Sequence, residues 1–153
     1  MAATLGAIRP DDWNFPLLLH VLGAMVLVGA LVLAVAALFF AWRDGSEASA
    51  RLAFRSLLIG VIPSWILTRV SAQILLDKEG LEDAEFAWIE IGFIVTEPGF
   101  LFIIIATVLA GLATRRARRG EGAGAGVKVA AVLGSLLLAA YVVATWAMTT
   151  KPL

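Results

Sequence analysis

The sequence contains no cysteine, a single histidine and a single tyrosine among its 153 residues. Without cysteine, the chain has no disulfide, no thiolate metal site and no thiol nucleophile. One histidine excludes a metal site built from several histidines of one chain. Charged residues make up 16% of the chain, against about 25% in typical soluble domains. Because no Ser/His/acid set or metal cluster is visible either, we expect no enzymatic activity and no metal site.

Hydrophobic residues, in contrast, make up 61% of the chain. Four apolar runs each exceed the roughly 20 residues that a helix needs to cross the bilayer. The first run is longer than the apolar part of a signal peptide, so we interpret it as a retained helix. Strands are not expected, because an open sheet cannot satisfy its edges in lipid. The predicted fold is an all-α, four-helix transmembrane bundle forming one domain over 1–153, with helices at 16–41, 50–76, 84–114 and 127–149.

The basic residues are distributed unevenly between the connections. The loops after the first and third predicted helices, with the adjoining helix ends, hold Arg43, Arg51, Arg55, Arg115, Arg116, Arg118, Arg119 and Lys128. The other side holds only Arg9, Lys78 and Lys151. Because cytoplasmic loops are enriched in Lys and Arg, both termini are predicted to lie outside a bacterial cytoplasmic membrane. The basic run 115–119 is read as this topology signal beside lipid headgroups, and no nucleic-acid partner is expected.

A second pattern concerns ionisable side chains inside the apolar runs, which cost roughly 2.5–3.5 kcal/mol each on insertion scales. With a rise of about 1.5 Å per residue, His20, Arg69 and Glu97 lie roughly 9, 12 and 14 Å below the outer boundary. Three different helices therefore carry ionisable groups at overlapping depths. We predict that they meet in a polar cluster in the outer leaflet. The candidate residues are Arg69, Glu97, Gln73, His20, Tyr141 and Thr145.

Two prolines fall inside the predicted helices. Pro98 follows Glu97 and precedes Gly99, and a proline removes one backbone N–H and clashes with the preceding turn. We expect the helix to kink or unwind there and free backbone acceptors near the cluster. Pro63 predicts a second disturbance near the middle of its helix.

Each candidate also has a purely structural interpretation. Arg69 and Glu97 can form an ion pair that only orients two helices. His20 can bond a neighbouring carbonyl, or it can serve as a haem ligand, a metal ligand or a proton acceptor. Tyr141 and Thr145 can simply pack in the core.

The first helix reads His20-Val-Leu-Gly-Ala-Met-Val-Leu-Val-Gly29, and the chain ends Trp146-Ala-Met-Thr-Thr-Lys-Pro152. Together these segments resemble a family of small four-helix integral membrane proteins of bacteria that have no established activity. The His-x8-Gly opening is also similar to the first helix of the copper-resistance D-type membrane proteins. That resemblance implies a copper or b-type haem role, but only one histidine is present. Met25, Met148 or a symmetric dimer would have to supply a second haem ligand.

We therefore expect a non-enzymatic membrane protein that binds or moves a small solute, ion or proton, as a homo-oligomer or within a larger complex. No resident cofactor is expected. The alternatives are a membrane redox protein that binds haem b through His20, and an accessory subunit of a larger membrane complex.

Overall fold

A computed structural model of the protein describes residues 11–80 and 86–150. Every regular element in this part of the chain is helical: η1 (Asp11–Trp13), α1 (Asn14–Asp44), α2 (Glu47–Arg55), η2 (Ser56–Val61), α3 (Ile62–Glu79), α4 (Ala87–Arg118) and α5 (Gly124–Thr150). Since α2, η2 and α3 are continuous, 4 helical stretches in these residues are long and apolar enough to cross a membrane. The predicted all-α four-helix bundle is confirmed, and its spans are those of a multi-pass membrane protein.

Three of the spans extend beyond both predicted ends, because polar residues continue a helix where the apolar run stops. The third span, α4, begins at Ala87, later than the predicted start at 84, and continues past the predicted end to Arg118. α1 ends at Asp44, and the next residue, Gly45, has a φ of 65°, in the left-handed region that favours glycine. Ser46 then caps α2 by accepting a hydrogen bond from the backbone N–H of Ser49 at 3.3 Å. Of the third predicted helix, residues 84–85 lie outside the described residues.

The disturbance predicted at Pro63 takes the form of the π-helical turn η2, whose last residue, Val61, lies two positions before the proline. A π turn has wider backbone spacing and accommodates the proline ring and the missing N–H. At this turn the Ser56 hydroxyl donates to the carbonyl oxygen of Ala30 in α1 at 2.7 Å. Gly60 permits this approach, because a Cβ at that position would lie 2.8 Å from the Ala30 Cβ. The π turn is therefore bound to α1 by a hydrogen bond and by a close backbone approach.

At Pro98 the expectation of unwinding is wrong, because α4 is helical without interruption from Ala87 to Arg118. One proline removes one backbone hydrogen bond, and the adjoining turns keep theirs. Gly99 lies against α5, where a Cβ would stand 3.3 Å from the hydroxyl oxygen of Tyr141. The Pro98-Gly99 step therefore provides a close helix contact and no gap in the helix.

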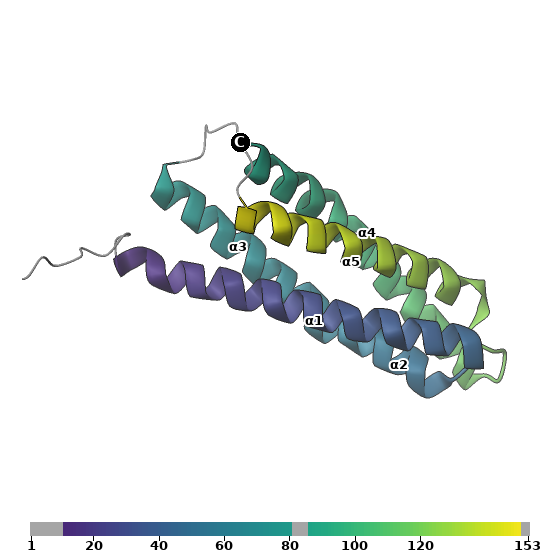
Figure 1. Ribbon diagram of the computed structural model, residues 1–153. Coiled ribbons are helices and arrows are strands. Elements are labelled where there is room, and N and C mark those ends of the chain that lie inside the picture. The colour runs from purple at the N-terminus through teal and green to yellow at the C-terminus, as the bar shows by residue number, and fades with distance from the viewer. Residues whose placement is uncertain (1–10, 81–85, 151–153) are drawn as a thin grey trace, which may run out of the picture.

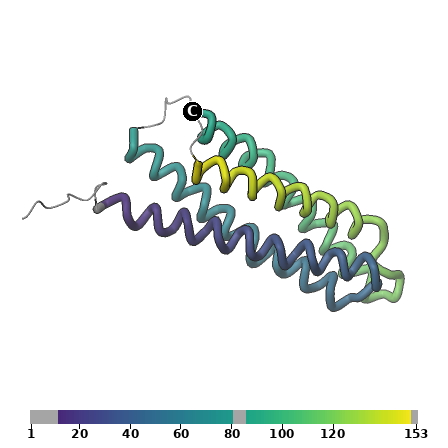
Figure 2. Tube along the Cα trace, viewed as in Figure 1, coloured from purple at the N-terminus to yellow at the C-terminus, as the bar shows by residue number. Residues whose placement is uncertain are grey.

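The four spans pack as two pairs, α1 with α3 and α4 with α5 (Figures 1 and 2). The fully buried large side chains gather in the half of the bundle that holds the α1–α2 and α4–α5 connections, and they include Leu31, Leu38, Leu57, Ile103 and Val127. In the other half, α3 and α4 make few contacts. Large side chains span the distance between them there.

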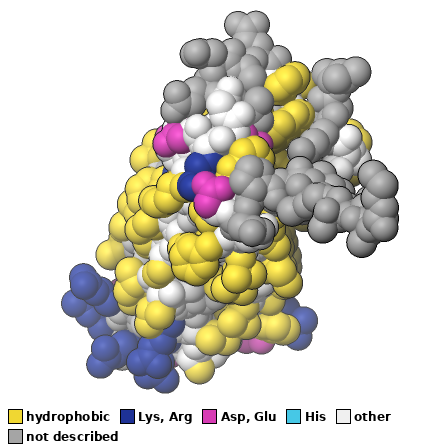
Figure 3. Space-filling model, turned by 90° about the vertical axis from the view of Figure 1, so that its left-hand side faces the viewer, with side chains coloured by type: hydrophobic (Ala, Val, Ile, Leu, Met, Phe, Trp, Pro, Cys, Tyr) yellow, Lys and Arg dark blue, Asp and Glu magenta, His cyan; other side chains and the backbone are white. Residues whose placement is uncertain are grey.

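The two ends of the bundle differ in charge. Figure 3 shows Lys and Arg side chains gathered at one end, an apolar surface beyond it, and a smaller charged group towards the other end. We call the end with the α1–α2 and α4–α5 connections the basic end. The opposite end, where the described chain begins and finishes, is called the terminal end.

Candidate functional site

Four polar side chains form a continuous hydrogen-bonded series between α4 and α3 in the terminal half. Arg69 donates from Nε to Oε1 of Glu97 at 2.8 Å and from a terminal guanidinium nitrogen to Oε1 of Gln73 at 3.0 Å. Gln73 in turn donates from Nε2 to Oδ1 of Asp77 at 2.9 Å. The three α3 residues are spaced four apart, so they share one face of the helix. We call Glu97, Arg69, Gln73 and Asp77 the polar ladder.

Aromatic side chains close the ladder on the side nearer the membrane centre. The Trp65 ring stacks on Phe100 with centroids 4.2 Å apart. Its indole N–H donates to the carbonyl oxygen of Thr96 at 3.2 Å. The guanidinium carbon of Arg69 lies 5.0 Å from the centre of the Phe93 ring, within the range of a cation–π contact. Arg69 is thus held by a carboxylate, an amide and a ring.

The ladder reaches deep into the apolar part of the bundle. Glu97 follows the first residue of α4 by ten positions, which corresponds to about 15 Å of helix. Its side chain is nevertheless 56% exposed, while that of Arg69 is 24% exposed. The surrounding surface is apolar, with Val70, Ile94 and Leu101 exposed. A half-exposed carboxylate therefore lies at membrane depth on the outside of the bundle.

His20 does not join the polar ladder, which corrects the predicted cluster. Its Nδ1 lies 3.0 Å from the carbonyl oxygen of Thr68. Thr68 precedes Arg69 by one residue, and one residue turns a helix by about 100°, so His20 meets a different face of α3. In residues 11–80 and 86–150, no hydrogen bond or ion pair connects His20 to Arg69 or Glu97. Because a carbonyl only accepts, Nδ1 carries a proton in this contact.

Tyr141 and Thr145 also lie apart from the ladder. Thr145 is exposed, and its hydroxyl donates to the carbonyl oxygen of Tyr141 in its own helix at 2.8 Å. Tyr141 is 7% exposed and faces Gly99 at the α4–α5 contact. Its hydroxyl lies near the Trp65 side chain, but the Trp65 N–H donates to the carbonyl oxygen of Thr96 instead. The structure thus brings together Arg69, Gln73 and Glu97 of the six candidates.

Sequence reasoning missed Asp77 and the aromatic contacts of the ladder. The signal was present, because Trp65, Arg69, Gln73 and Asp77 follow one another at steps of four. Phe93, Glu97 and Phe100 likewise lie on one face of α4, at spacings of four and three.

A second polar contact lies at the terminal end, outside the apolar spans. Lys78 donates from Nζ to Oδ2 of Asp12 at 2.6 Å and so joins η1 to the end of α3. This hydrogen bond, with the charge of Lys78, holds the pKa of Asp12 below its ordinary value of 3.8. Asp12 therefore stays ionised near neutral pH, and the contact is lost only when acid protonates it.

No protein-family model, curated protein or solved structure matches the chain. Within the described residues, no group of three His, Asp or Glu side chains is placed to hold a metal ion.

Proposed function

We propose that the protein lies in the bacterial cytoplasmic membrane and takes up a small cation, the proton included, at Glu97 from the terminal side. The supporting observation is the half-exposed Glu97 carboxylate, which lies at membrane depth and is linked through Arg69 and Gln73 to Asp77 near the terminal end. Acids inside membrane spans are rare and typically belong to ion or proton pathways.

The charges of the ladder favour a cation. Two carboxylates, Glu97 and Asp77, stand against one guanidinium, so the ladder carries a net negative charge. Arg69 engages only one oxygen of Glu97, and Oε2 has no hydrogen-bond partner within the described ranges. That oxygen is the acceptor that a hydronium ion, a small cation or a polar solute with a donor group would meet.

The orientation follows from the basic residues. The basic end carries Arg43, Arg51, Arg55, Arg115, Arg116, Arg118, Arg119 and Lys128. The positive-inside rule places this end in the cytoplasm and the terminal end outside. The ladder then opens towards the outer side of the membrane.

Passage across the whole membrane requires more than one copy of the chain. The stack of Trp65 on Phe100 closes the ladder near the membrane centre, and Glu97 faces away from the bundle core. A single four-helix chain encloses little volume. We therefore propose a homo-oligomer in which a second chain covers the α3–α4 face and completes the path.

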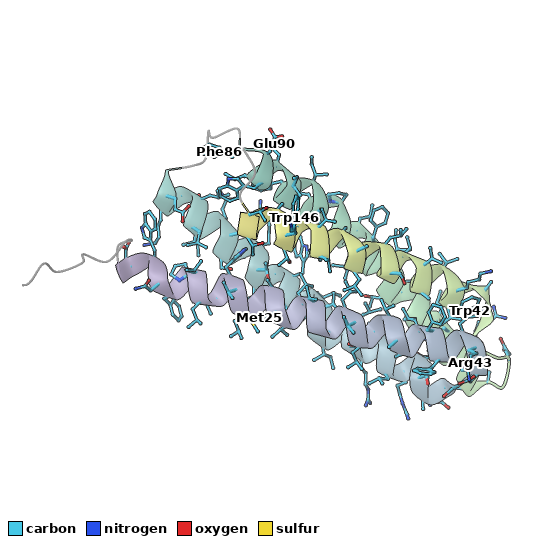
Figure 4. All side chains as sticks on the ribbon, viewed as in Figure 1. Met25, Trp42, Arg43, Phe86, Glu90 and Trp146 are labelled. Carbon is cyan, nitrogen blue, oxygen red and sulfur yellow. The ribbon has the colours of Figure 1, made fainter. Side chains whose placement is uncertain are left out.

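Ion flux into proteoliposomes tests the proposal, with a pH-sensitive dye for protons and tracer uptake for sodium and potassium. We expect flux through the native protein, and a decrease of about tenfold in Glu97→Gln, equal to about 1.4 kcal/mol in the limiting barrier. Glu90→Gln is the matched control, because Glu90 is exposed in the first turn of the same helix (Figure 4). It should conduct like the native protein. Absence of flux, or equal flux through both variants, would refute the proposal.

Haem binding at His20 is the second candidate, and one observation favours it. A ligating histidine usually donates its other ring N–H to a carbonyl or carboxylate, which is what the contact of Nδ1 with Thr68 provides. The resemblance to copper-resistance D-type proteins points the same way. A Soret band that is lost in His20→Ala would support this function, and freshly purified protein without the band would rule it out. Isolation in fixed ratio with larger membrane proteins would instead favour the role of accessory subunit.

A further inference from the structure

A groove lies on the surface between α1 and α5 towards the basic end, far from the polar ladder. It has a volume of about 220 Å³ and is lined by Phe39, Trp42, Ala131, Val132, Ser135 and Leu136. The one hydroxyl in it, that of Ser135, donates to the carbonyl oxygen of Ala131 at 2.8 Å and offers no free donor to an occupant. The groove therefore suits a hydrocarbon chain.

A cation stands at the mouth of this groove. Lys128 precedes Val132 by one helical turn, and its Nζ lies 5.3 Å from the centre of the Trp42 ring. The ring face attracts the ammonium charge but leaves its N–H donors available to another partner. The first turn of α5 adds the partial positive charge of a helix N-terminus.

Lys128 has no carboxylate partner within the described ranges, and neither do Arg55, Arg115 and Arg119. Of these four cations, only Lys128 lies over an aromatic ring. Arg43 pairs with Asp44 at 3.1 Å, and Arg116 pairs with Glu121 at 3.7 Å. Within residues 11–80 and 86–150, the Lys128 ammonium has a cation–π contact with the ring of Trp42 and no anionic partner. An anion supplied from outside the chain would complete the site.

The groove lies at the height of a lipid headgroup and its first acyl carbons. Trp42 precedes the last residue of α1 by two positions (Figure 4), where tryptophan typically marks the membrane interface. Phe39 meets it edge-to-face at 5.3 Å between ring centroids and forms the wall on the α1 side. From Lys128 to Leu136 the groove descends eight residues, about 12 Å along the helix.

We propose that this groove binds one anionic glycerophospholipid, with its phosphate at Lys128 and one acyl chain along Phe39, Trp42 and Leu136. The unpaired ammonium selects against zwitterionic headgroups, and the apolar lining orders the chain. This site is independent of the polar ladder and of any ion flux, since it lies on other helices at the opposite end.

Native mass spectrometry of the full chain, with phosphatidylglycerol and phosphatidylcholine added in equal amounts, tests the site. The native protein should retain one phosphatidylglycerol in preference. Lys128→Gln should lower this preference by about fivefold, as expected for one Lys near an anionic surface. Arg55→Gln is the control, because it removes a basic-end cation that does not line the groove, and it should bind like the native protein.

A second variant distinguishes the contribution of the apolar groove to lipid binding from that of the Lys128 charge. Val132 is 52% exposed, so Val132→Phe fills the groove without disturbing the core, and it should lose the bound lipid although Lys128 remains. Equal retention of both lipids by the native protein would overturn the proposal. So would an equal loss in Lys128→Gln and Arg55→Gln, because it would show attraction to the basic end as a whole.

Discussion

Arg69→Met is expected to lower the free energy of unfolding by about 3 kcal/mol, because it leaves the half-exposed Glu97 carboxylate unpaired within an apolar span, where a lone charge costs roughly 2.5–3.5 kcal/mol. It removes the only hydrogen-bond partner of the Glu97 carboxylate in the described chain. Glu97→Leu should cost less, because Arg69 keeps Gln73 and the ring of Phe93. The double variant should regain most of the native stability, since an apolar pair leaves no charge stranded in lipid. Reversible unfolding in bicelles measures all three.

The same variants separate structure from function. If the double variant folds like the native protein but carries no ion flux, the pair acts in binding. A double variant whose destabilisation equals the sum of the two single losses would contradict the expected coupling of the two side chains.

Gly23→Leu is the second substitution with a large expected effect. A Cβ at Gly23 would stand 2.6 Å from Oγ1 of Thr68 and 3.1 Å from its backbone nitrogen. A backbone atom cannot move aside cheaply, so α1 and α3 would have to separate, at a cost of about 1–3 kcal/mol or more. The separation should also break the contact between His20 and Thr68, which is visible as a changed imidazole signal in NMR spectra.

Gly29→Leu is the matched control on the same helix. A Cβ at Gly29 would meet nothing within 4 Å, so unfolding of the monomer in detergent should be unchanged. If the two variants were equally unstable, the close contact at Gly23 would not be the cause.

Hydropathy was sufficient to predict the four spans, because the length of an apolar run reflects the thickness of the bilayer. Hydropathy did not predict the helix ends. Between α1 and α2 the boundary is set by the left-handed conformation of Gly45 and by the cap that Ser46 provides. Hydropathy also could not show that Pro98 leaves α4 intact. Gly99 packs there against Tyr141 of α5, a contact between two helices that the sequence does not reveal.

The sequence predicted the position of the site residues along the helix axes but not the directions in which their side chains point. The similar depths of Arg69 and Glu97 along their helices indicated that the two side chains could meet. Nε of Arg69 does lie 2.8 Å from Oε1 of Glu97. The depth of His20 gave the same indication, but rotation about the helix axis turns it to Thr68 instead. Helical phase within one chain segment is readable from spacing, whereas the relative rotation of two helices is set by packing. The predicted place of Tyr141 and Thr145 in the cluster was wrong for the same reason, because depth along α5 does not show which way a side chain points.

The central claim is that water reaches Glu97 along the polar ladder from the outer side. Because the chain has no cysteine, single-cysteine variants can be labelled in intact cells with a membrane-impermeant maleimide. Glu97→Cys and Gln73→Cys are expected to react. Ile94→Cys is expected to stay unlabelled, although Ile94 lies three residues nearer the terminal end, because its 69% exposed side chain is part of the apolar surface outside the ladder. Labelling of Ile94→Cys with none at Glu97→Cys, or no labelling at either position, would contradict the claim.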